Sequence, residues 1–531
     1  MNLSHICWYD EGGVKTIRKF LKTWIPRLAL AAATTYLIFC LLPPLKMFFE
    51  LDWKALFFPY TLDYGEGPLL EQTLRLAHFQ NIYHNNLNQS PYTISNYPPL
   101  FPLVQVPFLW IFGPALWYGR LLSILSILAA AVFIGLTVQS ITRSYLAGIT
   151  SGLLLLVIPY IFQWSPLNRI DSLALALSWV GLYVIVRGSS RQALDQSAPR
   201  AKQTLFKSFQ SDLTSQPWLI AGAACLTAAI FTRQTYALAA PLAAFVWLLH
   251  LAPRRRAIHL AVLVASPSLL LVILLTLTSQ GGFFTNTIAA NVNPFIWSTV
   301  QYYATPIWRN MRFLVVGAAA FSLAGAVKPW RVAAWWLVAP YLLGAVVSGL
   351  TIGKDGSNVN YLFEFSAALS LAAGALVAWL DNNYWLWRTV LVVLVAVQVT
   401  TIYNWSHQEY YPLHISRMLF QSTDLARLNT LVKSTGGLVL ADEHMALLPL
   451  NGKNLYFQPF EFKMMEQAGL WDQQAFVEQI KRKEFALILL YNPPDWDSRH
   501  ARWTDEELSA IDANYFYAQN LADTIIYKPD K

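Results

Sequence analysis

Apolar runs, separated by short polar segments, recur along the chain from residue 25 to residue 403 and then stop. Most are close to the roughly 20 residues that an α-helix needs to cross the hydrocarbon core of a bilayer. The pattern predicts a mainly α, polytopic transmembrane protein with about eleven helical spans. The expected spans are residues 25–48, 121–138, 145–162, 172–186, 218–231, 236–250, 257–277, 313–326, 333–350, 362–380 and 387–403.

One further apolar run, residues 98–112, is marginal for a span and is not counted among the eleven. It has about 15 residues and begins within "YPPLFP", so we expect it to lie along the membrane surface. The alternative is that it crosses the bilayer. In that case every later loop would change sides, and the loops richest in Lys and Arg would lie outside.

The tail, residues 404–531, has the composition of a soluble domain. The segments "GGLVLA" and "FALILLY" predict buried strands, and "DQQAFVEQIKRK" predicts a helix. Thr504 with Glu507 forms a capping-box pattern before another helix. We therefore expect two domains, a transmembrane domain over residues 1–403 and a small α/β domain over residues 404–531.

Composition and charge agree with a membrane protein and set its orientation. The chain has 531 residues, of which 55% are hydrophobic and 13% charged, and its mean hydropathy is +0.39. The net charge of +8 is concentrated in short segments between spans, which argues against a nucleic-acid partner and for cytoplasmic loops. This places the N-terminus in the cytoplasm, the first loop (about residues 49–120) outside, and the C-terminal domain extracytoplasmic. The basic segments include Lys15, Arg18, Lys19, Lys22 and Arg27; Arg187, Arg191, Arg200, Lys202 and Lys207; and Arg254, Arg255 and Arg256.

This topology brings ionisable residues from several separate loops to the outer membrane edge. Such residues at a membrane edge suggest a functional site, although loops are polar in any protein. The outer set is Asp63, Glu66, Arg120, Arg169, Asp171, Arg233, Lys354 and Asp355.

The segment "LDYGEGPLLEQ" carries two of these acids, Asp63 and Glu66, before an amphipathic pattern that predicts a short helix on the membrane surface. Either carboxylate could act as a general base on an acceptor hydroxyl. The alternative is a helix-capping turn, in which the acids face the helix dipole.

The basic members of the outer set are candidates for binding the phosphate of a lipid, because guanidinium groups match phosphate oxygens. For each arginine the alternative is a structural ion pair, and Arg169 could simply compensate Asp171. The chain has no Walker loop, dinucleotide fingerprint, HExxH motif or zinc-spaced cysteine pair.

Several motifs together resemble the GT-C superfamily of glycosyltransferases that use polyprenyl-phosphate sugars. The likeness is to protein O-mannosyltransferases, lipid A aminoarabinose transferases and RgtA/B/C/D-like transferases, and it covers roughly residues 51–374. The motifs are an acid in the first outer loop, a Pro-Pro-Leu helix, an Arg-Leu pair opening a span, a second acid opening a later span, a basic residue in a turn, and a tyrosine opening a late span. The corresponding residues are Asp63; Pro98, Pro99 and Leu100; Arg120 and Leu121; Asp171; Arg233; and Tyr361.

The resemblance implies a hexosyl- or pentosyltransferase of the cell envelope, which moves a sugar from a polyprenyl-phosphate donor to a lipid, glycan or protein on the outer face. Inversion at the anomeric carbon would follow if the base activates the acceptor hydroxyl for direct displacement. The resemblance also implies that Asp63, Glu66 and Asp171 serve catalysis and that Arg120, Arg169, Arg233, Lys354 and Tyr361 bind the donor. A divalent cation is a possible cofactor. The sequence departs from the superfamily in two places, because the two acids are three residues apart and Arg233 stands where lysine is usual. The alternative function is a transporter or flippase of a lipid-linked sugar, although the chain has no paired repeat with broken helices.

Overall fold

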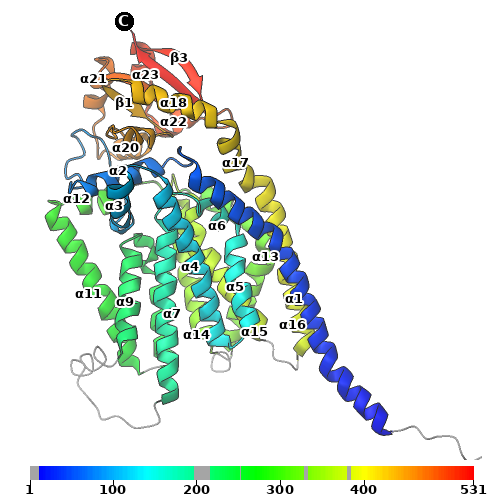
Figure 1. Ribbon diagram of the computed structural model, residues 1–531. Helices are drawn as coiled ribbons and strands as arrows, with labels where there is room; N and C mark the ends of the chain where they lie inside the picture. Colours follow the sequence, from blue (N-terminus) through cyan, green and yellow to red (C-terminus); the bar gives the residue numbers. More distant parts are fainter. Residues whose placement is uncertain (1–10, 196–215, 252, 328–332, 380–383, 531) are drawn as a thin grey trace, which may run out of the picture.

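The structure, a computed structural model, describes residues 11–195, 216–251, 253–327, 333–379 and 384–530. Figure 1 shows a bundle of long helices with a small α/β domain above one end. Nine helical segments in the described part are long and apolar enough to cross a membrane, and they identify an integral membrane protein. They correspond to all or most of α1 (Glu11–Phe57), α4 (Trp117–Thr142), α7 (Asp171–Asp195), α10 (Ala239–Leu251), α11 (Arg254–Thr278), α13 (Trp297–Val327), α14 (Trp335–Gly349), α15 (Phe363–Trp379) and α16 (Trp385–Trp405).

The predicted mainly α, polytopic fold is confirmed. The nine segments, together with the shorter helices α5 (Tyr145–Val157) and α9 (Pro217–Ile230), overlap the expected spans one for one. The short run at residues 98–112 forms α3 (Leu100–Phe112), which lies in Figure 1 at the level of α2 (Glu66–Ala77), above the upper end of α9.

One predicted span is broken. The run at residues 145–162 divides into α5 and α6 (Pro159–Trp164), because Pro159 has no backbone N–H and holds Ile158 in an extended conformation. The turn leads the chain to Trp164, which lines the cavity described below.

Helix α2 lies between the bundle and the C-terminal domain. A Cβ at Gly67 would come within 2.6 Å of the Ala446 backbone nitrogen, so glycine permits this close approach. Leu69 and Leu70 are buried on the same helix. The predicted amphipathic helix therefore forms, but its upper face is covered by the C-terminal domain.

The C-terminal domain is built on a four-stranded sheet in the order β1-β2-β4-β3, in which the β1–β2 pair is parallel and the others are antiparallel. The two predicted strands are β1 (Leu438–Ala441) and β2 (Phe485–Tyr491), and the capping box of Thr504 and Glu507 is present. The remaining elements are β3 (Tyr515–Leu521), β4 (Thr524–Pro529), α18 (Ser422–Ser434), α19 (Leu447–Leu450), α20 (Pro459–Gln467), α21 (Gln474–Lys481), α22 (Ser498–Arg502) and α23 (Asp505–Asn514).

The first loop is part of the same unit as this domain. Tyr92 donates its backbone N–H to the Tyr456 carbonyl (2.8 Å) and accepts from Gln458 N–H (3.1 Å). Its ring is buried against Phe462 and Trp471 in the aromatic core of the domain. A helix after α16, α17 (Tyr411–Phe420), runs beside α1 and makes a second connection to the domain (Figure 1).

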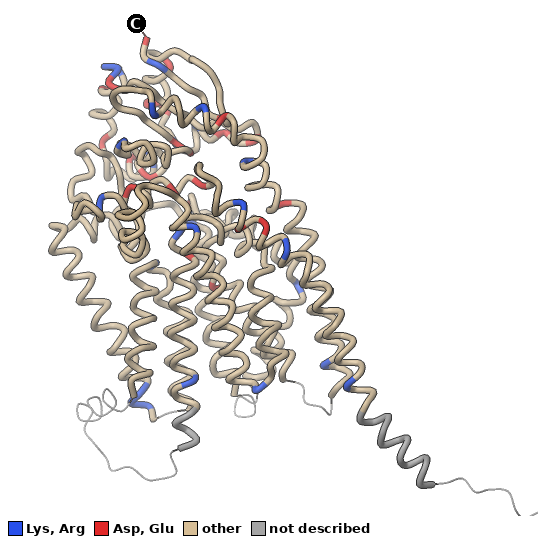
Figure 2. Tube along the Cα trace, viewed as in Figure 1, with Lys and Arg blue, Asp and Glu red and all other residues tan. Residues whose placement is uncertain are grey.

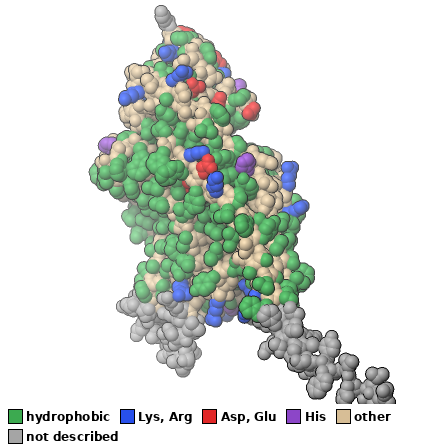
Figure 3. All heavy atoms as spheres, turned by 45° about the vertical axis from the view of Figure 1, so that its right-hand side comes forward, with side chains coloured by type: hydrophobic (Ala, Val, Ile, Leu, Met, Phe, Trp, Pro, Cys, Tyr) green, Lys and Arg blue, Asp and Glu red, His purple; other side chains and the backbone are tan. Residues whose placement is uncertain are grey.

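Charge is distributed unevenly between the two ends of the bundle. Figure 2 shows Lys and Arg at the lower ends of the helices, whereas the acids are concentrated in the upper layer and the C-terminal domain. Figure 3 shows a broad hydrophobic surface below that domain. Much of the predicted basic loop after α7, including Arg200, Lys202 and Lys207, lies outside the described residues.

Candidate functional site

A cavity of about 1410 Å³ lies between the upper end of the bundle and the C-terminal domain. Both parts of the chain contribute charged or aromatic side chains to its wall. From the first 403 residues these include Asp63, Trp164, Arg169, Arg233, Lys354 and Tyr361, and from the tail Arg417, Glu443, Glu461, Tyr491, Trp496 and Arg502.

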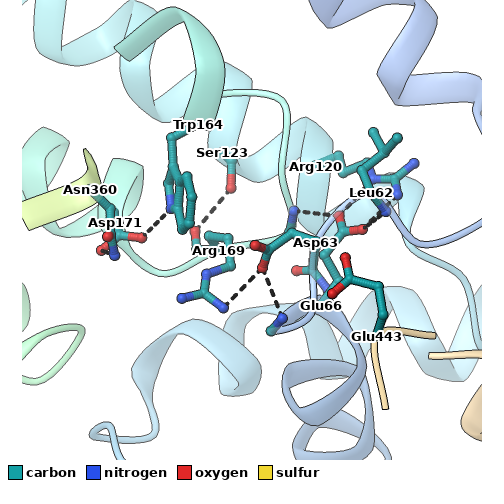
Figure 4. Close-up of polar contacts among 12 residues, drawn as sticks. Leu62, Asp63, Glu66, Arg120, Ser123, Trp164, Arg169, Asp171, Asn360 and Glu443 are labelled. Atoms are coloured by element: carbon teal, nitrogen blue, oxygen red, sulfur yellow. Dashed lines mark hydrogen bonds and ion pairs between the residues drawn. The ribbon is translucent and has the colours of Figure 1, made fainter. Parts of the chain in front are cut away.

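Asp63 faces this cavity. Its Oδ2 atom accepts hydrogen bonds from the backbone N–H of Gly65 (2.8 Å) and from Nη1 of Arg169 (3.2 Å), as Figure 4 shows. The side chain is 18% exposed. The bond to Gly65 is local and closes a turn before α2. A carboxylate held in this way has a fixed orientation and can still be reached from the cavity.

Glu66 has a different environment, although it is three residues away. Its side chain has no exposed surface and accepts backbone N–H groups from Leu62 (2.8 Å) and Asn168 (2.9 Å). Arg120 donates to both carboxylate oxygens at 2.8 Å. All these partners lie outside the cavity wall except Leu62, so Glu66 is a buried anchor of the loop.

Arg120, which is predicted to bind the donor phosphate, does not line the cavity. A guanidinium group has five N–H donors. Nε and Nη2 bind Glu66, Nη1 binds the carbonyls of Ala55 and Phe58, and Nη2 also binds the carbonyl of Tyr60, at 2.5 to 2.8 Å. Every donor is used, so none is left for a ligand.

Asp171 is also fully buried and does not line the cavity, in contrast to the direct catalytic role predicted for it. It pairs with Arg233 and accepts hydrogen bonds from Trp164 Nε1 (2.7 Å) and Asn360 Nδ2 (3.2 Å). Figure 4 shows Asp171 with Trp164 and Asn360, beside the Asp63 loop. The alternative in which Arg169 neutralises the charge of Asp171 is wrong, because Arg169 forms its ion pair with Asp63.

Arg233 does line the cavity, and its guanidinium lies 4.2 Å from the centroid of the Tyr361 ring. Its Nε and Nη2 atoms are buried and have no hydrogen-bond partner among the described residues. Arg169 likewise has an unpartnered Nε and stacks on Trp164 at 5.1 Å. Lys354 lies on the same wall, partly exposed. These cations can still bind an anion, whereas every N–H donor of Arg120 is already used within the protein.

The electrostatic surroundings distinguish the cavity acids from one another. Burial raises the pKa of Asp63; Arg169 opposes this, while the carboxylates of Glu443 and Glu66 add to it. Burial alone would also raise the pKa of Glu66, but Arg120 and the hydrogen bonds reverse this and lower it. Glu443, beside Asp63 in Figure 4, is buried as well, but Arg417 and Arg502 lower its pKa to about 2.

Replacing Glu443 with glutamine should shift the acidic limb of the activity profile to lower pH. If Asp63 is the general base that the sequence predicts, the rate should rise with pH through its pKa, because a general base works when deprotonated. Glu443 is ionised over the working range, and removing its charge takes away one of the influences that raise this pKa. The measurement is the initial rate against pH, with Glu478→Gln on the exposed face of α21 as the control. An acidic limb at the same pH as in the wild type would show that the charge of Glu443 does not affect the pKa of the group that titrates.

The cavity residues of the tail were not predicted. Glu443 is the second residue after β1, and Tyr491 ends the neighbouring parallel strand β2. Polar residues beyond the carboxyl ends of parallel strands commonly line binding sites. The segment "ADEHM" after an apolar strand was therefore a signal that could have identified them.

Among the described residues, no group of three His, Cys, Asp or Glu side chains is arranged to hold a metal ion. The divalent cation stays a prediction.

No family model matches the sequence, and no curated protein matches it either. Solved structures do share its fold. ArnT from Cupriavidus metallidurans, a lipid A aminoarabinose transferase, is 15% identical with a TM-score of 0.55, and the match covers 93% of this chain and 98% of that one. That protein has also been solved bound to undecaprenyl phosphate. The archaeal oligosaccharyltransferase AglB from Archaeoglobus fulgidus, in complex with an inhibitory peptide and a dolichol-phosphate, is 12% identical with a TM-score of 0.53, over 94% of this chain and 74% of that one.

Proposed function

We propose that the protein is a glycosyltransferase that moves a sugar from a polyprenyl-phosphate donor to an acceptor in the cavity. Its fold is shared by ArnT and AglB, which are both members of the GT-C superfamily. The observation that carries this proposal is that an accessible carboxylate, Asp63, and two arginines with unused N–H groups, Arg169 and Arg233, line the same cavity at the end of an apolar bundle. A lipid phosphate and a hydroxyl acceptor need these two kinds of group.

In the proposed reaction, Asp63 takes the proton from the acceptor hydroxyl as its oxygen attacks the anomeric carbon of the donor sugar. The bond from that carbon to the phosphate oxygen breaks, and the electron pair leaves with the polyprenyl phosphate. Direct displacement inverts the anomeric configuration. Arg169 and Arg233, with Lys354, would stabilise the negative charge that develops on the leaving phosphate.

The remaining predicted residues act through others in this scheme. Glu66 and Arg120 hold the loop that carries Asp63, and Asp171 orients Arg233. Tyr361 supports the guanidinium of Arg233 through its ring face.

We also propose that the C-terminal domain lies on the extracytoplasmic side and the N-terminus in the cytoplasm. Support comes from the Lys and Arg residues at the end of the bundle opposite that domain (Figure 2), because such residues favour the cytoplasmic side. The acceptor would then be a lipid, glycan or protein of the cell envelope.

The function can be tested with purified protein in lipid vesicles. Undecaprenyl-phosphate-linked hexoses and pentoses are supplied one at a time with a cell-envelope lipid and glycan extract, and products are identified by mass spectrometry. Transfer of one sugar with release of undecaprenyl phosphate supports the proposal. Movement of an intact labelled donor across the vesicle, without bond cleavage, would instead support the transporter alternative.

Binding of the bare lipid phosphate should depend on Arg233. A charge-assisted hydrogen bond contributes about 1.5–3 kcal/mol, so Arg233→Met should weaken the affinity for undecaprenyl phosphate by roughly 10- to 100-fold. Arg143→Met, at the far end of α4, serves as the control. Titration followed by tryptophan fluorescence measures both affinities, and melting curves verify that each variant is folded. Equal affinities for the two variants would show that Arg233 does not bind the phosphate.

A further inference from the structure

Arg502, at the end of α22, connects the C-terminal domain to the loop that carries Asp63. Its Nη1 donates to Asp442 (2.5 Å) and its Nη2 donates to Glu443 (2.8 Å). The guanidinium lies 4.5 Å from the centroid of the Tyr64 ring. The side chain is only 10% exposed, and its two acidic partners fix its orientation.

Tyr64, the residue after Asp63, has a second contact with the same domain. Its hydroxyl donates to Oε2 of Glu461 on α20 (2.7 Å). The face and the edge of the ring are therefore both held by the C-terminal domain.

The residue on the other side of Asp63 is held as well. The Leu62 carbonyl accepts from Nη1 of Arg417 (2.9 Å), and Arg417 also binds Glu443 (2.8 Å). Both neighbours of Asp63 are thus attached to one charged group that Arg502, Glu443 and Arg417 form in the tail.

We propose that Arg502 is a positioning residue, which holds Tyr64 so that the carboxylate of Asp63 points at the acceptor. This inference rests on the proposed function. Arg502 is less suited than Arg169 and Arg233 to bind the donor phosphate, because three acids surround it: it forms ion pairs with Asp442 and Glu443, and Glu461 lies near it. The C-terminal domain then forms part of the reaction centre in addition to covering it.

The test is Arg502→Lys, compared with Arg499→Lys on the same helix. Lysine keeps the charge but cannot form two fixed bonds and a planar stack at once. Arg499 pairs with Asp512 outside the cavity, so its substitution changes the same domain without touching the loop. Each variant is assayed for sugar transfer, for undecaprenyl phosphate affinity and for hydrogen exchange of residues 60–66.

For Arg502→Lys we expect kcat to fall by roughly 10-fold or more, undecaprenyl phosphate affinity to stay within about twofold, and exchange in the loop to rise by roughly fivefold or more. Arg499→Lys should change none of the three. Loop exchange and kcat that match those of Arg499→Lys would overturn the proposal. A lower kcat without faster exchange would also overturn it, because Arg502 would then act on the substrate directly.

Tyr64→Leu provides the second test if Arg502→Lys does not fold. It removes the ring and the hydroxyl, and it should reproduce the loss of kcat and the faster exchange. Combined with Arg502→Lys it should add little, because both changes remove the same link. Additive losses would contradict a shared link. If the wild-type protein transfers no sugar, the proposed function fails, whereas the exchange comparison still decides whether Arg502 holds the loop.

Discussion

Replacing Asp63 with asparagine should lower kcat for sugar transfer by about 10²- to 10⁴-fold, the usual contribution of a general base. Asparagine has nearly the same shape and can still accept the N–H of Gly65, but it cannot take the acceptor proton. The affinity for undecaprenyl phosphate should stay close to that of the wild type, because Arg169 and Arg233 are unchanged. Single-turnover transfer and a binding titration measure the two quantities separately.

The stability of Asp63→Asn is an informative control. Because the folded protein raises the pKa of Asp63, its ionised form is less favourable in the folded state than in the unfolded chain. Ionisation at neutral pH therefore costs stability, and removing the charge should leave the melting temperature unchanged or raise it. Asp424→Asn, at an exposed ion pair on α18, controls for the loss of any surface acid. If Asp63→Asn retains transfer and Glu66→Gln loses it without unfolding, the base is Glu66.

Hydropathy was sufficient to predict most of the fold. The bilayer sets the length of each span, so apolar runs located the helices, and α3 was set apart because counting it as a span would have placed the basic loops outside. The strands β1 and β2 were visible as short apolar runs. The break at Pro159 was missed because the run around it stays apolar, although proline gave a local signal.

The sequence predicted which residues belong to the outer layer, but it did not predict which of them form ion pairs with one another. Position in the outer layer follows from topology, whereas the choice of partner depends on how helices pack around the loop. Arg120 and Glu66 are 54 residues apart, and Arg233 and Asp171 are 62 apart. Nothing local to either residue shows that the pair will be buried.

The two acids of the loop illustrate this limit. In the sequence, Asp63 and Glu66 are equivalent candidates. In the structure, Glu66 begins α2 and turns toward Arg120 inside the protein, while Asp63 lies before the helix and faces the cavity. Burial and pairing therefore divide the two carboxylates into an anchor and a candidate base.

Removing Arg120, the ion-pair partner of the buried anchor Glu66, should have the largest effect on folding. Arg120→Met leaves the Glu66 carboxylate buried without its counter-charge and removes the donors to three backbone carbonyls. Loss of one partner of a buried ion pair costs about 3–5 kcal/mol, so we expect the free energy of unfolding to fall by that amount. Glu66→Gln should also destabilise the protein, and the double variant Glu66→Gln/Arg120→Met should lose less than the sum of the single changes.

The pH dependence of unfolding gives an independent test of the same pair. The folded protein lowers the pKa of Glu66, so the pair stabilises the fold above the unfolded-state pKa of about 4.3 and ceases to do so as the pH falls through the lower folded value. Chemical unfolding in detergent, measured between neutral and acidic pH, should show this loss for the wild type and a smaller loss for the double variant. Folded Arg120→Met should still bind undecaprenyl phosphate. If Arg120→Met instead has wild-type stability but binds the lipid phosphate more weakly, Arg120 belongs to the donor site. The Glu66–Arg120 pair would then have to open when the lipid binds.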